Sequence, residues 1–121
     1  MSLFAPAAMV VEVREEVREA AHRDAPRVFR LSNSISDSGL ILERPAPFEV
    51  GRPVTASFIL PDLVTATPLA LRATVELIDS DGDGSGGGSH LIFVEPRRET
   101  RQLIVRYVMG RLGLPGGEPR Q

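Results

Sequence analysis

Hydrophobic and polar residues alternate through the middle of the chain, a pattern that predicts half-buried β-strands. The runs 53–60 (PVTASFIL) and 69–78 (LALRATVELI) keep this period of two over their whole length. Shorter apolar runs at 27–31, 40–42 and 90–94 are rich in β-branched and aromatic residues, and turn residues follow them. We therefore expect a series of short strands between residues 27 and 94.

The apolar spacing changes to that of a helix near residue 98. Glu99 lies in the predicted first turn and Arg111 in the last, where their charges favour the helix dipole, and Gly113 predicts the stop. A broad apolar stripe runs along this helix and comprises Ile104, Val105, Val108, Met109 and Leu112, with Leu103 and Tyr107 at its margins. The stripe predicts packing against the strands. A homodimer interface through the C-terminal helix is the alternative.

The segment 10–20 fits two patterns. Val10, Val13 and Val17 recur at helical spacing, whereas Val11, Val13 and Val17 share one face of a strand. Its glutamate- and arginine-rich composition favours a helix on propensity alone. The residues themselves leave both alternatives open.

The composition indicates one globular domain, because 121 residues of which 42% are hydrophobic suit a single core. We expect this domain to span residues 1–113 and a flexible tail to follow at 114–121. The formal net charge of −2 gives no indication of a nucleic-acid or membrane partner, and the absence of cysteine excludes disulfides and thiolate metal sites. No apolar run approaches the length of a membrane span, so a cytoplasmic location is expected.

All 14 basic residues are arginines. Either a GC-rich genome or a preference for phosphate and guanine explains this usage, because planar guanidinium groups bind both in a bidentate manner. Arginines four positions apart recur at 14/18, 23/27 and 97/101. We interpret each pair as a solvated face, since this many arginines produce such pairs by chance.

No residue pattern for catalysis or metal binding is evident. The sequence DSDGDGS at 79–85 matches the start of a calcium loop, but His90 stands at the twelfth position, where a glutamate is needed. It therefore predicts a hairpin loop. His22 and His90 are isolated from other metal-ligating residues, and the serines at 32–38 lack a nucleophile-elbow pattern. We expect no metal, no cofactor and no enzymatic activity.

The order of the elements resembles that of the PilZ family of bacterial signalling domains, over roughly residues 27–112. The segments SNSISDSGLIL, EVGRPVTASFILPD, LRATVELID and HLIFVEPRRETRQLIVRYV carry the resemblance. It implies a mainly β fold, in which a six-stranded antiparallel barrel is followed by a C-terminal α-helix. It also implies cyclic di-GMP as a ligand and a protein partner to which the signal is relayed.

Typical PilZ domains bind cyclic di-GMP through two motifs, and the second of them, [DN]-x-S-x-x-G, ends the second strand. By this resemblance Ser36 and Gly39 match its serine and glycine, and Ser34 stands at its first position. Asn33 lies one residue too early. An offset of one residue on a strand points to the opposite face unless a bulge intervenes.

The other motif, R-x-x-x-R, precedes the first strand in the family. Arg23 and Arg27 have its spacing and are the implied clamp for phosphate and guanine. However, Arg27 lies only seven positions before Ser34, which leaves no room for a first strand between the motifs. If residues 10–19 form the first strand, only MSLFAPAA and Met9 precede it, and the arginine segment of the family is absent from that position.

The resemblance supports two functions. In the first, the chain is a cyclic-di-GMP receptor, in which Arg23 or Arg27 clamps the ligand over Ser36 and Gly39. In the second, it is a degenerate PilZ domain that binds no nucleotide and acts as a protein–protein adaptor in pilus or motility regulation.

Overall fold

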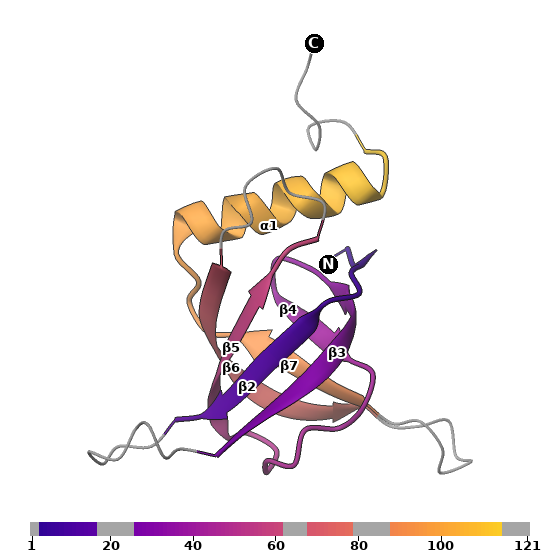
Figure 1. The fold of residues 1–121 in the computed structure, drawn as a ribbon. Coiled ribbons are helices and arrows are strands. Elements are labelled where there is room, and N and C mark those ends of the chain that lie inside the picture. The colour runs from indigo at the N-terminus through magenta and orange to yellow at the C-terminus, as the bar shows by residue number, and fades with distance from the viewer. Residues whose placement is uncertain (1–2, 17–25, 62–67, 79–87, 115–121) are drawn as a thin grey trace.

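The computed structural model describes residues 3–16, 26–61, 68–78 and 88–114, with the side chains of 77 and 78 left aside (Figure 1). The calcium-like sequence at 79–85, His22 and Arg23 lie outside the described residues. The elements are β1 (Ala5–Pro6), β2 (Val10–Glu15), β3 (Arg27–Ile35), β4 (Gly39–Leu42), β5 (Pro53–Ile59), β6 (Pro68–Ile78), β7 (Gly88–Phe93) and α1 (Arg98–Arg111).

The strands form a closed antiparallel barrel. Neighbours pair in the order β3-β2-β5-β6-β7-β4, and β4 pairs back onto β3 and so completes the ring of six. The two-residue strand β1 adds to the end of β3, and α1 lies across one end of the barrel (Figure 1). The predicted fold class, a six-stranded barrel with a C-terminal helix, is therefore confirmed.

The N-terminal segment is a strand as far as it is described, which settles the choice left open for residues 10–15. Val11 and Val13 point into the barrel and are fully buried, while Glu12 and Arg14 lie on the outside. Pairing with both β3 and β5 outweighs the helix propensity of this sequence, because packing of the two valines requires the alternation of a strand.

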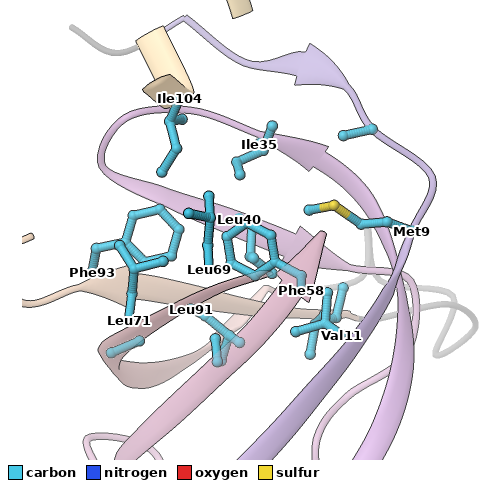
Figure 2. Packing of buried hydrophobic residues seen from close by; sticks show 14 of the residues in the cluster. Met9, Val11, Ile35, Leu40, Phe58, Leu69, Leu71, Leu91, Phe93 and Ile104 are labelled. Carbon is cyan, nitrogen blue, oxygen red and sulfur yellow. The ribbon is translucent and has the colours of Figure 1, made fainter. Parts of the chain in front are cut away.

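Alternating residues of β5 and β6 fill the barrel, as their sequences predict. Phe58 from β5 and Leu69 and Leu71 from β6 point inward, and Leu91 from β7 meets them in the centre (Figure 2). The rings of Phe58 and Phe93 stack with their centroids 6.4 Å apart. This apolar interior is the main source of stability, since it removes the large side chains from water.

Helix α1 packs against the barrel through a narrower and differently centred face than the sequence stripe predicts. Ile104, Tyr107 and Val108 are buried, whereas Val105 and Leu112 each remain 36% exposed. Inclusion of Val105 and Leu112 in the packed stripe is therefore wrong. Successive helical residues differ by about 100°, so Val105 is rotated away from a face centred near Ile104, while Leu112 lies beyond the last residue of the helix.

The helix ends as predicted. The N–H of Leu112 donates to the carbonyl oxygen of Val108 (3.0 Å), and Gly113 has φ = 69°, a conformation that favours glycine after a helix. The predicted tail begins at Leu114, whose N–H still donates to Met109 (2.8 Å); the rest of the tail lies outside the described residues. In the described part, no helix has the length and apolar character needed to cross a membrane.

Candidate functional site

The serine-glycine connection between β3 and β4 is a tight turn built around Ser36. The N–H of Ser36 donates to the carbonyl oxygen of Gly39 (2.8 Å), and its hydroxyl oxygen accepts from the N–H of Ser38 (3.1 Å). The hydroxyls of Ser36 and Ser38 are 2.9 Å apart. Ser36 is fully buried, so its side chain stabilises the turn from within. Ser38 is the exposed hydroxyl here.

Gly39 allows β4 and β7 to approach closely. A Cβ atom at this position would overlap the carbonyl oxygen of Leu91 and lie 2.9 Å from Nε2 of His90. His90 lies partly buried against Phe4, with their ring centroids 5.6 Å apart. In the described structure this Nε2 has no hydrogen-bond partner. The glycine of the motif thus has a packing role that requires no ligand.

Asn33 and Ser34, the two candidates for the first position of the motif, lie at a β-bulge in β3. Ser32 pairs with Leu42 but Ser34 pairs with Ile41, so one extra residue, Asn33, is inserted in β3. Asn33 is exposed and Ser34 half-buried, while Ser32 and Ile35 on either side are buried. The bulge reverses the alternation and places both Asn33 and Ser34 away from the core.

Residues 3–9 lie along the same end of β3. Ala5 pairs with Ile35, and the hydroxyl of buried Ser32 donates to the carbonyl oxygen of Ala7 and accepts from the N–H of Met9 (3.2 Å). The hydroxyl of Tyr107 on α1 donates to the carbonyl oxygen of Pro6 (3.4 Å). These bonds join the N-terminal segment to both the motif strand and the helix. The segment itself, LFAPAAM, carries no charged side chain.

Replacement of Ser32 with alanine is expected to reduce the free energy of unfolding by about 2 kcal/mol, because two buried backbone groups lose their partner. Chemical denaturation measures the loss, and faster hydrogen exchange at Met9 locates it. Ser34→Ala on the same strand is the control and should change stability by less than about 0.5 kcal/mol. Equal losses in the two variants would show that Ser32 does not hold the N-terminal segment.

The structure places Arg27 far from the turn. Arg27 begins β3, whereas Ser34 and Ser36 lie at its other end, about 23 Å away along an extended strand. Its guanidinium pairs with Glu12 (3.3 Å) and lies over the ring of Phe29 (5.8 Å to the centroid). Ser34, Ser36 and Gly39 are brought together, but Arg27 does not join them. A ligand-binding role for these residues stays a prediction.

The arginine that does reach the turn is Arg101 of α1. Its Nη2 lies 3.3 Å from Oδ2 of Asp37, and its Nε donates to the same oxygen. Sequence reasoning noted Arg101 as one of a four-apart pair with Arg97 but assigned it to a solvated face. Nothing in the sequence indicates that the helix returns beside the turn, since 64 positions separate the two residues.

A closed six-stranded barrel with a helix across one end and a serine-glycine turn after its second long strand is the fold of PilZ domains. Solved structures similar to this chain establish that class. The inhibitor of motility MotI/DgrA from Bacillus subtilis is similar with a TM-score of 0.74 at 18% sequence identity. The match covers 93% of this chain and 50% of that chain, so this chain spans half the length of MotI/DgrA.

Two isolated PilZ domains are similar over nearly their full length. The PilZ domain of CeSA from a cellulose-synthesizing bacterium has a TM-score of 0.58 at 22% identity, with 90% of this chain and 97% of that chain covered. The PilZ domain of YcgR from Escherichia coli, solved with c-di-GMP, has a TM-score of 0.59 at 9% identity, with coverages of 93% and 90%. No family model matches the chain, and no curated protein matches it. At these identities the likeness shows the fold alone.

Proposed function

We propose that this chain is a non-enzymatic, cytoplasmic signalling module of PilZ type that acts by binding a protein partner and has little affinity for cyclic di-GMP. The observation that carries the proposal is the N-terminal segment, residues 3–9, which is hydrogen-bonded along the motif end of β3 and holds no cation. A cyclic dinucleotide needs guanidinium groups on its phosphates, and an apolar segment at this place supplies none.

Arg27, the arginine of the implied clamp that the structure describes, supports the same conclusion. Arg27 is already paired with Glu12 and lies at the opposite end of β3 from the turn. Ser36 and Gly39, the retained residues of the motif, have packing roles that explain their presence without a nucleotide. The inhibitor of motility among the similar structures supports a regulatory role in motility.

A cyclic-di-GMP receptor is the second candidate, and one observation favours it. Arg101 of α1 pairs with Asp37 in the turn, one residue before the exposed Ser38, and therefore supplies one guanidinium group near the retained motif. The c-di-GMP present in the similar YcgR domain supports this candidate for the fold in general.

Calorimetric titration with cyclic di-GMP is expected to give no heat of binding up to about 100 µM ligand, which corresponds to a binding free energy weaker than about −5.5 kcal/mol. The PilZ domain of YcgR, titrated in the same buffer, is the positive control. A Kd below about 1 µM would contradict the proposal and establish the receptor. Loss of that binding in Arg101→Ala, with Arg27→Ala unaffected, would then place the nucleotide at the turn.

A further inference from the structure

The outward face of α1 carries a shallow arginine-lined hollow. Its volume is about 520 Å³, and it is lined by Arg98, Arg101, Gln102, Val105 and Arg106. All five residues are exposed, whereas Ile104 on the same helix is buried against the barrel. We call these five residues the arginine face.

Several arginines of the barrel are paired with glutamates of the N-terminal strand region. Arg27 pairs with Glu12 (3.3 Å), and Arg72 pairs with Glu16 (3.0 Å). The hydrogen bond to Glu16, together with its charge, raises the pKa of Arg72 above its ordinary value. Each of these guanidinium groups therefore already has a carboxylate partner within the domain.

The arginine face is different because its charge is largely uncompensated. Arg101 pairs with Asp37, but Arg98 and Arg106 form no ion pair with any residue in the described ranges. Residues 97–111 contain five arginines and one glutamate, a net charge of +4 in a chain whose formal net charge is −2. The positive charge is thus concentrated on one exposed helix, and an acidic binding partner complements it.

The dimensions of the face favour a polypeptide over a compact anion. Arg98 and Arg106 are eight residues apart on the helix, a rise of about 12 Å, which exceeds the span of a single phosphate group. Val105 lies between them in sequence and is 36% exposed, and Leu112, directly after the helix, is equally exposed. Arginine is enriched at protein–protein interfaces relative to the rest of the protein surface.

We propose that the arginine face binds an acidic, amphipathic segment of a partner protein. Carboxylates of the segment pair with Arg98 and Arg106, and its apolar side chains cover Val105 and Leu112. Arg101 stays paired with Asp37 and brings the serine-glycine turn to the border of this interface. The inference rests on the proposed function, because it names the surface through which the module reaches its partner.

The test uses the full chain and a synthetic amphipathic peptide of glutamate and leucine, about 20 residues long so that it spans the helix. Amide chemical shifts in NMR spectra are expected to change at the arginine face on titration. Binding should weaken with added salt, and Arg98→Glu combined with Arg106→Glu should lower the affinity at least about tenfold. Arg44→Glu is the control, since it reverses an exposed charge on the barrel, and should leave the affinity within about twofold.

Several results would overturn the inference. These are no binding by the wild-type chain, equal binding by the double variant, or equal binding of a peptide with lysine in place of glutamate. Binding of tripolyphosphate or anionic vesicles in preference to the peptide would assign the face to phosphate groups. A salt-sensitive dimer lost in Arg98→Glu would assign it to a second copy of the chain. Tight binding of cyclic di-GMP would contradict the proposed function but would not change the interpretation of the peptide titration.

Discussion

Replacement of Ile104 with alanine is expected to lower the free energy of unfolding by about 3 kcal/mol. The side chain of Ile104 is fully buried and points from the helix into the end of the barrel (Figure 2). Its truncation leaves a cavity that the rigid barrel cannot close, so dispersion contacts are lost in addition to the transfer energy. Thermal unfolding should show a decrease in Tm of at least about 10 °C.

The neighbouring residue supplies the matched control. Val105→Ala removes aliphatic carbon from the same turn of the helix, but the side chain is 36% exposed, and the expected loss is below about 0.7 kcal/mol. A far-ultraviolet circular dichroism spectrum checks that both variants keep the helix. If the two variants were equally stable, α1 would not be docked through Ile104, and the arginine face would not be its outward side.

Replacement of Gly39 with alanine is expected to destabilise the protein by about 3 kcal/mol. The new Cβ atom would overlap the carbonyl oxygen of Leu91, which belongs to the backbone of the paired strand β7. Relief of the overlap requires β4 and β7 to separate, which weakens their hydrogen bonds and disturbs the buried side chain of Leu40. Urea denaturation, with the change in midpoint converted at constant m-value, measures the loss.

Gly51→Ala is the control for the glycine-to-alanine change itself. Gly51 has φ = 85° and open space around its Cα, so alanine there is strained but meets no atom, and about 1 kcal/mol is expected. A Gly39→Ala variant no less stable than Gly51→Ala would remove the packing explanation for Gly39. The glycine of the motif would then be retained for close approach of a ligand, which favours the receptor candidate.

Strands in which polar and apolar residues alternate clearly could be predicted from the sequence. The alternation in β5 and β6 indicates which side faces the core, because each strand has one solvent-exposed face and one buried face. The N-terminal segment shows the converse. Ala5, Ala7 and Met9 are buried and the residues between them are not, yet APAAMV is apolar throughout. Period two is invisible where both faces are apolar, so β1 was not expected.

The geometry of the candidate site was predictable only where it depends on residues close together in sequence. The turn from Ser36 to Gly39 depends on residues close together in the chain, and its position is correct. The bulge at Asn33 and the proximity of Arg101 depend on how distant elements pair, which no local spacing encodes. Arginine spacing alone selected Arg27, whose strand position carries it to the opposite end of β3.

The closure of the barrel has a consequence for how the chain folds. Four of the six strand pairings join elements adjacent in sequence, but β4 meets β7 between residues such as Leu40 and Leu91, 51 positions apart. Closing so long a loop reduces the entropy of the chain before these contacts contribute any stability. Ring closure is therefore expected to limit the folding rate. During synthesis, β4 can pair with β3, but its other edge stays unpaired until β7 has left the ribosome.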